Sequence, residues 1–319
     1  MTYHIEQDLT TDDVLGDMDL TGKRVLVTGA GGGLGLETCR ALAVRGAEVV
    51  GTARDLEKAR LAGASVIGHM SGSVELVDLD LASLQSVRQC TGSILATGEP
   101  FDAVICNAGV MATPQGKTKD GFETQFGVNH VGHFLLVNLI APLLRSGARV
   151  IVLSSMGHRI ADIDLEDPNF ERRPYDPMTS YGASKTANIL FAVEMDKRLR
   201  SRGIRAAAVH PGVITDTNLS RHVPDEQFAA YLDYVNSKSD IHQRNKSIPQ
   251  GAATTVWSAF VATADEVGGQ YCQDTQVFAT NDSEEISNTG PRAYAVDPAR
   301  SARLWQVSER LVGQSFSYG

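Results

Sequence analysis

The sequence predicts an α/β fold, a single doubly wound domain built on a central parallel sheet of about seven strands. Two observations support this prediction. Short runs rich in β-branched residues alternate with stretches of helical apolar spacing over most of the 319 residues, and a cluster of glycines stands directly after the first such run. Strands joined through helices pair in parallel by right-handed crossovers, and the helices then cover both faces of the sheet.

The predicted elements follow one another without an internal repeat or a low-complexity linker. The predicted strands are 24–28, 47–53, 74–79, 101–106, 149–154, 204–209 and 269–278. A first helical pattern ends at Gly46 and a second begins near Leu81. A third follows the strand 101–106 and extends to about Leu144, and a fourth contains Tyr181. We therefore expect one domain over residues 21–319, preceded by an acidic arm of residues 1–20, with ligands bound beyond the carboxyl ends of the strands.

Composition excludes several classes of function. The net charge of −9 and the pI near 5.4 argue against a nucleic-acid partner or an anionic membrane surface. No apolar run approaches the roughly 20 residues needed to span a bilayer. The acidic N-terminus lacks the apolar segment of a signal peptide, so a cytoplasmic location is expected. The four cysteines show no C-x-x-C spacing and are expected to be buried, inert thiols.

The stretch T-G-A-G-G-G-L-G-L-E at 28–37 lies between the first strand and the first helix. Gly29 suits a tight turn, Gly33 lets backbone approach a pyrophosphate, and Gly35 permits close packing of helix on strand. The helix N-terminus offers free N–H groups to phosphate. Glycines also occur in ordinary turns, but this position in the chain favours a Rossmann-type dinucleotide site.

Five motifs occur in a fixed order: T-G-A-G-G-G-L-G, C-N-A-G at 106–109, S-S-M at 154–156, Y-G-A-S-K at 181–185 and H-P-G at 210–212. Together they resemble the short-chain dehydrogenase/reductase family, from Thr28 to about Val277. The stretches N-A-G-V-M, D-G-F-E-T-Q-F-G-V-N-H-V-G-H-F-L-L and S-K-T-A-N-I-L-F resemble its retinol-dehydrogenase-like branch. The resemblance implies a nicotinamide dinucleotide cofactor and interconversion of an alcohol with a carbonyl compound.

The resemblance also implies a set of cofactor contacts. These are Gly29, Gly31, Gly32, Gly33, Leu34, Gly35, Arg54, Asp80, Leu81, Asn107, Ala108, Gly109, Tyr181, Lys185, Pro211, Gly212, Val213 and Thr217. At the family's threonine position this chain has Asp216, with Thr215 and Thr217 on either side. Thr217 is preferred because T-N-L-S-R-H aligns better after a one-residue insertion.

The end of the second strand bears on the choice of dinucleotide. Ala53 stands where NAD-dependent relatives carry an acid, and Arg54 follows it. A cation suits the 2′-phosphate of NADP, whereas a carboxylate suits the 2′-hydroxyl of NAD. NADP(H) is therefore expected. The alternative is NAD, with Arg54 solvated and Asp55 holding the ribose.

Reduction of a carbonyl needs a proton donor, and tyrosine is a poor one because its ordinary pKa is about 10. Lys185 follows Tyr181 by four residues and shares its helix face, so its ammonium would lower the pKa of Tyr181. A Tyr–Lys pair of this spacing is common on protein surfaces, and the accompanying motifs favour the catalytic interpretation. The resemblance implies that Ser155, rather than Ser154, orients the substrate oxygen, and that Asn129 holds a water in the proton relay to Lys185.

His130 and His133 form an H-x-x-H pattern, but no third ligand stands at a recognisable spacing, so no metal is expected.

The substrate side is less well defined by sequence. Residues 216–250 correspond to the family's substrate lid, and the aromatic residues at 228, 231 and 234 could line a pocket or pack on their own domain. No arginine pair is placed to clamp an anion, which favours a neutral, lipophilic ketone, aldehyde or alcohol. Ser155 and Tyr181 are 26 positions apart. The retinol-dehydrogenase-like branch shares this insertion, and residues within it can reach the edge of a pocket.

The sequence thus predicts an NADP(H)-dependent carbonyl reductase or alcohol dehydrogenase with Tyr181 as general acid and base. One alternative is a non-catalytic scaffold that senses dinucleotides. A second is a reductase of a carbon–carbon double bond, as in the related protochlorophyllide reductases. A homo-oligomer formed through the helices before and after Ser155 is possible by analogy with the family.

Overall fold

The computed structural model describes residues 8–64, 70–224, 244–283 and 289–318, with a few isolated positions between 226 and 237. Eight strands form one sheet in the order β3-β2-β1-β4-β5-β6-β7-β8. They are β1 (Arg24–Thr28), β2 (Glu48–Ala53), β3 (Ser73–Asp78), β4 (Phe101–Cys106), β5 (Leu144–Leu153), β6 (Arg205–His210), β7 (Tyr271–Gln273) and β8 (Gln276–Val277). The order reverses between β1 and β4, so the crevice for ligands opens there.

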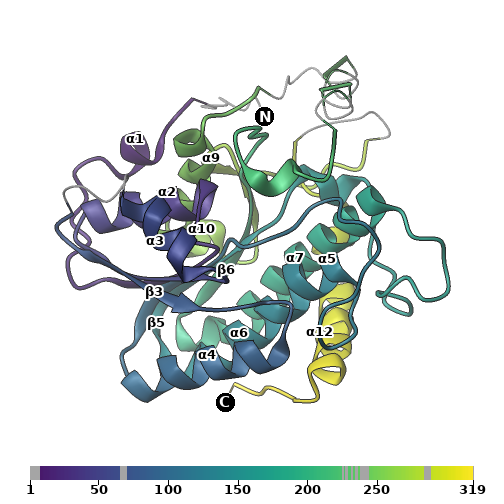
Figure 1. Ribbon diagram of the computed structural model, residues 1–319, viewed down its shortest axis with the longest axis horizontal. Coiled ribbons are helices and arrows are strands. Elements are labelled where there is room, and N and C mark those ends of the chain that lie inside the picture. The colour runs from purple at the N-terminus through teal and green to yellow at the C-terminus, as the bar shows by residue number, and fades with distance from the viewer. Residues whose placement is uncertain are drawn as a thin grey trace.

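Helices cover both faces of the sheet, as expected for a doubly wound domain (Figure 1). The helices are α1 (Thr11–Leu15), α2 (Gly33–Val44), α3 (Leu56–Ala64), α4 (Leu84–Thr97), α5 (Thr124–Phe126), α6 (Gly132–Ile140), α7 (Pro177–Leu199), α9 (Ile248–Val256), α10 (Ala264–Val267), α11 (Ala293–Val296) and α12 (Pro298–Val312). One apolar core lies between the sheet and α4, α6, α7 and α12, and a second lies between the sheet and α1, α2 and α9. The central strands β1, β4 and β6 are buried on both sides, which explains their continuous apolar runs, whereas the edge strand β3 is largely exposed.

The predicted doubly wound sheet is confirmed, with three differences in its elements. The predicted strand 269–278 is two short strands, β7 and β8, which pair antiparallel across a turn in which Asp274 and Thr275 have φ of 47° and 53°. β5 begins at Leu144 rather than near 149. The helix expected directly after β4 begins only at Thr124, because residues 107–123 form a loop, of which residues 107–111 line the cofactor crevice.

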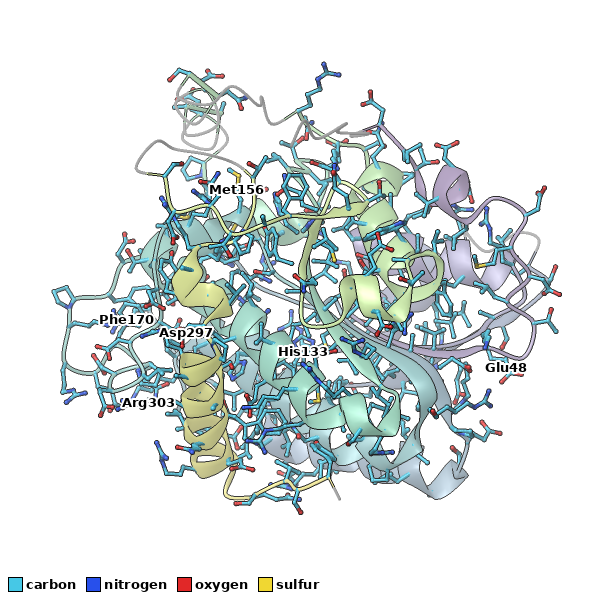
Figure 2. All side chains as sticks on the ribbon, turned by 180° about the vertical axis from the view of Figure 1, so that it is seen from behind. Glu48, His133, Met156, Phe170, Asp297 and Arg303 are labelled. Carbon is cyan, nitrogen blue, oxygen red and sulfur yellow. The ribbon has the colours of Figure 1, made fainter. Side chains whose placement is uncertain are left out.

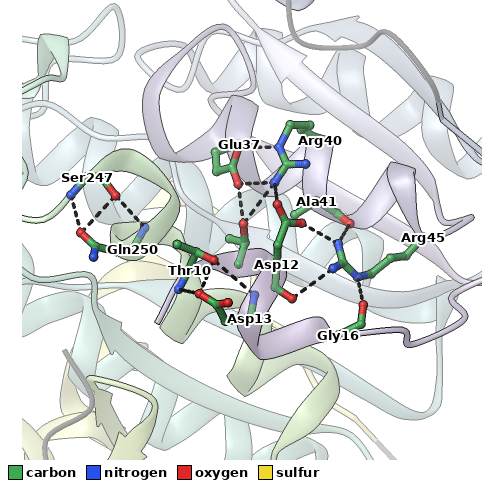
Figure 3. Close-up of polar contacts among 11 residues, drawn as sticks. Thr10, Asp12, Asp13, Gly16, Glu37, Arg40, Ala41, Arg45, Ser247 and Gln250 are labelled. Carbon is green, nitrogen blue, oxygen red and sulfur yellow. Dashed lines mark hydrogen bonds and ion pairs between the residues drawn. The ribbon is translucent and has the colours of Figure 1, made fainter. Parts of the chain in front are cut away.

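The second half of the predicted acidic arm packs on the domain. Leu15 at the end of α1 and Leu20 join the core beside α2 and are 3% and 2% exposed. Asp12 accepts hydrogen bonds from Arg40 and Arg45 at 2.9 Å each (Figure 3). These apolar and ionic contacts hold residues 11–20 against α2 and α9.

The sequence Thr124–Leu143 forms one continuous helical run through α5 and α6. It is long and apolar enough to cross a membrane by length and composition alone, contrary to the expectation that no such run exists. In the structure 83% of this segment is buried within the domain. It is the central helix of the larger core, and its apolar character is explained by that burial.

The C-terminal helix α12 packs along α7 and contacts the run that precedes β5. The ring of Trp305 lies 4.9 Å from Phe134 of α6 and 6.1 Å from Phe191 of α7, measured between ring centroids. The helices before and after Ser155, which sequence suggested for an oligomer contact, are thus partly covered by this chain's own C-terminus.

Replacing Trp305 with Ala removes a side chain that is only 1% exposed and leaves a cavity between three helices. We expect the free energy of unfolding to fall by about 3–5 kcal/mol, measured by urea denaturation. Leu61→Ala is the control, because Leu61 is 71% exposed and its loss leaves no cavity. Equal stability of the two variants would contradict this packing.

Candidate active site

The glycine turn after β1 lets a ligand approach the protein backbone closely. Gly29 has φ of +74°, and a Cβ on Gly35 would stand 2.2 Å from the carbonyl oxygen of Gly29 and 2.5 Å from Asn107 Nδ2. Only glycine permits this close approach of α2 to β1. The first residue before α2 is Gly32, so no side chain caps the helix. Its first N–H groups and positive dipole end therefore face the crevice ready for a phosphate.

The end of β2 brings two cations to the same crevice. Arg54 follows the strand and Lys58 lies in the first turn of α3; both are exposed and line the cavity. The carboxylate of Asp55 accepts a hydrogen bond from the backbone N–H of Lys58 at 2.9 Å and so caps α3. At the end of β3, Asp80 accepts a bond from Lys119 Nζ at 2.9 Å.

The loop after β4 is fastened to the end of β1. The Thr28 hydroxyl accepts the backbone N–H groups of Asn107 and Ala108 at 2.9 and 3.0 Å. Asn107 Nδ2 donates to the Thr28 carbonyl at 2.8 Å. These bonds hold the Asn107–Gly109 loop against the glycine turn, at the point where the strand order reverses.

Ser155 and Tyr181 meet across Gly157. A Cβ placed on Gly157 would lie 2.7 Å from Tyr181 Cε1 and 3.3 Å from Ser155 Oγ, so both groups border the space that this glycine leaves empty. Ser155 Oγ accepts the N–H of Gly157 at 3.0 Å, which keeps its own proton available to a ligand. Ser154 points elsewhere and donates to the carbonyl of Lys185 at 2.9 Å.

Lys185 lies one helical turn beyond Tyr181 and is only 4% exposed. Its Nζ lies 5.7 Å from the centroid of the Tyr181 ring and donates to the carbonyl of Leu153 at 3.1 Å. Burial lowers the pKa of Lys185 to about 8. Its proton is therefore more easily exchanged near neutral pH than that of a surface lysine.

Asn129 lies behind these residues in a wide helical turn, Gly127–Val131. Its side-chain oxygen accepts the N–H of Val110 at 2.8 Å, and its Nδ2 donates to Val110 O at 3.0 Å and to Ser184 Oγ at 2.9 Å. The amide thus joins the loop after β4 to α7, and Asn129 does not line the cavity.

The two histidines of the H-x-x-H pattern are core residues, each 1% exposed. His130 Nε2 lies 2.7 Å from Ser308 Oγ of α12, whereas His133 Nε2 lies 2.8 Å from Thr28 Oγ1. The four cysteines are free and buried. Burial raises the pKa of the Cys39 thiol to about 12 and that of Cys90 to about 11, so both are inert thiols.

One cavity of about 600 Å³ joins these parts. Every predicted cofactor contact lines it, from Gly29 in the glycine turn to Thr217 beyond β6, as do Ser155, Tyr181 and Lys185. Thr217 lies over the glycine turn, since a Cβ on Gly33 would stand 3.3 Å from its methyl group. The structure thus brings together in one crevice residues as far apart in sequence as Gly29 and Arg221.

The family model of the short chain dehydrogenases matches residues 23–227. The chain belongs to the short-chain dehydrogenase/reductase family. Among its relatives, human retinol dehydrogenase 13 is 37% identical, with 92% of this chain and 86% of the relative aligned. A short-chain dehydrogenase/reductase of Penicillium roqueforti is 36% identical over 96% of this chain and 91% of its own. These relatives agree with the predicted retinol-dehydrogenase-like branch.

Solved structures agree with this assignment of the fold. An uncharacterized protein from Mycobacterium Paratuberculosis superposes with a TM-score of 0.73 at 33% identity, covering 96% of this chain and 98% of that one. A short chain dehydrogenase from Burkholderia cenocepacia, solved in complex with NADP, has a TM-score of 0.61 at 24% identity over 80% and 96% of the two chains.

Several residues that line the site of this short-chain dehydrogenase/reductase were not found by sequence reasoning. Lys58 is one helical turn beyond the Arg54 position, a spacing that could have indicated a second cation. Three methionines from separate segments, Met111, Met156 and Met178, line the cavity, and Met111 and Met178 pack beside Tyr181. Nothing in their sequence spacing indicates that they meet.

The insertion between Ser155 and Tyr181 contributes only its ends to the cavity, through Met156, Gly157, Ile160 and Met178. Its middle is anchored elsewhere. Arg300 of α12 bonds the Ile163 carbonyl at 2.9 Å. The predicted lid aromatics at 228, 231 and 234 lie outside the described residues.

Replacing Lys185 with Met tests the cost of its burial. Below about pH 8 the folded protein holds a buried ammonium, whereas the unfolded chain keeps the ammonium solvated up to its ordinary pKa of 10.5. We expect the free energy of unfolding of the cofactor-free variant at pH 7 to exceed that of the wild type by about 1–3 kcal/mol. This difference in free energy should disappear as the pH rises from about 8 to 10.5.

Urea denaturation at pH 7 and pH 10 measures this difference. Asn188 still donates to the Leu153 carbonyl at 2.9 Å, so the substitution leaves that acceptor paired. Lys58→Met is the control, because Lys58 is exposed and its loss should leave no pH-dependent difference. A Lys185→Met protein that is less stable at pH 7 would show that burial is not the dominant cost.

Proposed function

We propose that the protein is an NADP(H)-dependent oxidoreductase that interconverts a lipophilic ketone or aldehyde with its alcohol, and that Tyr181 is the general acid and base. The observation that carries the proposal is that Ser155, Tyr181 and Lys185 line the same cavity as the glycine turn. A dinucleotide fits this cavity, because the uncapped N-terminus of α2 and the closely packed Gly35 suit a pyrophosphate. When bound, its nicotinamide supplies or accepts the hydride.

The chain's own residues handle the proton. In the reductive direction, Ser155 donates a hydrogen bond to the substrate oxygen and keeps it beside Tyr181. Tyr181 transfers its hydroxyl proton to that oxygen as negative charge develops there. The buried ammonium of Lys185, within 6 Å of the Tyr181 ring, favours the tyrosinate that results. Lys185 also exchanges its proton readily, and so restores the tyrosine for the next turnover.

The preference for NADP(H) rests on the end of β2. Arg54 and Lys58 both line the cavity there, and they provide two cations for a 2′-phosphate. Asp55, the alternative ligand for the ribose of NAD, is occupied as the cap of α3. Two cations and one already bonded carboxylate therefore favour a 2′-phosphate over a free 2′-hydroxyl at this edge of the cavity.

The substrate class follows from the surroundings of Tyr181. Its ring packs with Met111 and Ala112, and Met178, Leu219 and Val223 pack on this cluster. Methionine side chains are flexible and polarisable, so such a wall adapts to apolar substrates of different shape. This surface supports a lipophilic carbonyl compound over a carboxylate or a phosphate ester.

Replacing Tyr181 with Phe removes the proton donor and leaves the ring in place. We expect kcat for reduction of an apolar ketone or aldehyde to fall by roughly a hundredfold or more, while the dissociation constant of NADPH, measured by fluorescence, stays within about twofold. Tyr175→Phe is the control, since that hydroxyl bonds the Thr113 carbonyl outside the cavity. Full turnover by Tyr181→Phe would refute the mechanism.

Product analysis decides between the enzymatic alternatives. An alcohol from a ketone substrate supports the proposal, whereas a saturated ketone from an enone would indicate reduction of a carbon–carbon double bond. A protein that binds NADPH but turns over no member of a carbonyl and alcohol panel would instead be a dinucleotide sensor.

Replacing Arg54 with Ala tests the cofactor preference. We expect kcat/KM for NADPH to fall by about tenfold or more while that for NADH changes little, because only NADPH carries the 2′-phosphate. The control is Arg60→Ala, a change of an exposed arginine on α3 that does not line the cavity. Equal use of NADH and NADPH by the wild type would refute the preference.

A further inference from the structure

His133 on α6 links two parts of the site that sequence motifs treat separately. Its Nε2 lies 2.8 Å from Thr28 Oγ1 at the end of β1, and its Nδ1 lies 3.0 Å from the carbonyl oxygen of Asn129. The side chain is 1% exposed and lies in the interior of the domain (Figure 2). Its position on the helix places it between the cofactor loop and the relay asparagine.

The direction of each hydrogen bond in this link is determined. The Asn129 carbonyl can only accept, so Nδ1 carries a proton and donates it. Burial lowers the pKa of His133 to about 4, so the ring is neutral and Nε2 is an acceptor. Thr28 Oγ1 already accepts two N–H groups, and its own proton has His133 Nε2 at 2.8 Å and the Ile105 carbonyl at 3.4 Å within reach. The shorter contact is the better bond.

The backbone carbonyl of Asn129 accepts the bond from His133, while its side-chain amide bonds Val110 and Ser184. Asn129 lies in the π-helical turn Gly127–Val131, where the N–H of Gly132 bonds the Gly127 carbonyl five residues back instead of four. His133 is thus a side-chain donor that helps to set the direction of the Asn129 carbonyl in an irregular turn.

We propose that His133 is a positioning residue, which holds the Asn129 carbonyl in the direction that the proton relay to Lys185 requires, with the Thr28 bond fixing the orientation of the imidazole. This rests on the proposed function, since a relay matters only to an enzyme that resupplies a proton to Tyr181. His133 touches neither the cavity nor the reacting atoms. Its contribution is made through Asn129.

His130 provides a matched control within the same helical run. It is equally buried, and its Nε2 bonds Ser308 of α12, away from the cavity. His130→Phe and His133→Phe thus make the same change of side chain at two buried positions, of which one contacts the relay. A general effect on packing would appear in both variants.

The chain also shows how to restore the bond. Asn138 Nδ2 donates to the carbonyl of Phe134, four residues earlier on the same helix, at 2.7 Å. An asparagine at 133 can make the same bond to the Asn129 carbonyl. A glutamine there carries its amide one bond farther, toward Thr28, and does not reproduce that geometry.

The experiment compares these variants in carbonyl reduction with NADPH, with kcat, KM and the solvent deuterium isotope effect on kcat as readouts. We expect kcat of His133→Phe to be about tenfold or more below that of His130→Phe, with KM for the carbonyl substrate within about twofold. The solvent isotope effect should rise, because proton resupply becomes limiting. His133→Asn should recover most of kcat, and His133→Gln should not.

The proposal is overturned if His133→Phe and His130→Phe have the same kcat, or if kcat falls with no rise in the solvent isotope effect. Should the Phe variants not fold, the Asn and Gln pair decides, and equal kcat for those two overturns it. Failure of the proposed function would appear separately, as full turnover by Tyr181→Phe. An inactive Tyr181→Phe with unaffected His133 variants removes the positioning role alone.

Discussion

The burial of the Lys185 ammonium is the constraint on which the site depends. Its ammonium donates to the Leu153 carbonyl, and among the described residues no carboxylate forms an ion pair with it. A buried charge with so little compensation is costly, and the cost appears as a pKa lowered to about 8. The same cost makes the lysine useful, because a group that releases its proton near neutral pH can take part in a relay.

The surrounding structure holds Lys185 in place by satisfying its neighbours. Ser154 donates to the Lys185 carbonyl, and Asn188 donates to the same Leu153 carbonyl as Lys185. Ser184 Oγ accepts a hydrogen bond from the side chain of Asn129. Each of these residues comes from the end of β5, from α7 or from the wide turn before α6. Buried polar groups need hydrogen-bond partners, and these bonds supply them for the carbonyls of Lys185 and Leu153.

The fold delivers these groups to one place through the reversal of strand order between β1 and β4. The glycine turn follows β1 and the Asn107 loop follows β4, and Thr28 fastens them together. On the other side, Ser155 follows β5 and the H-P-G segment follows β6. Because parallel strands end at the same edge of the sheet, residues far apart in sequence share one cavity without long loops.

Local sequence patterns were enough to predict the doubly wound fold, the glycine turn and the cofactor contacts that line the cavity. These patterns are an alternation of strands and helices, glycines where a Cβ cannot fit, and a Tyr–Lys spacing of one helical turn.

Features that depend on partners distant in sequence were visible only in the folded structure. It showed that Asp55 caps α3 while Lys58 joins Arg54, and that Met111 and Met178 pack beside Tyr181. It also separated two histidines that look alike in sequence: three positions along one helix direct His130 to α12 and His133 to Thr28. Residue spacing predicts which side chains share a face of a helix. The neighbours of that face depend on tertiary packing, which no local pattern contains.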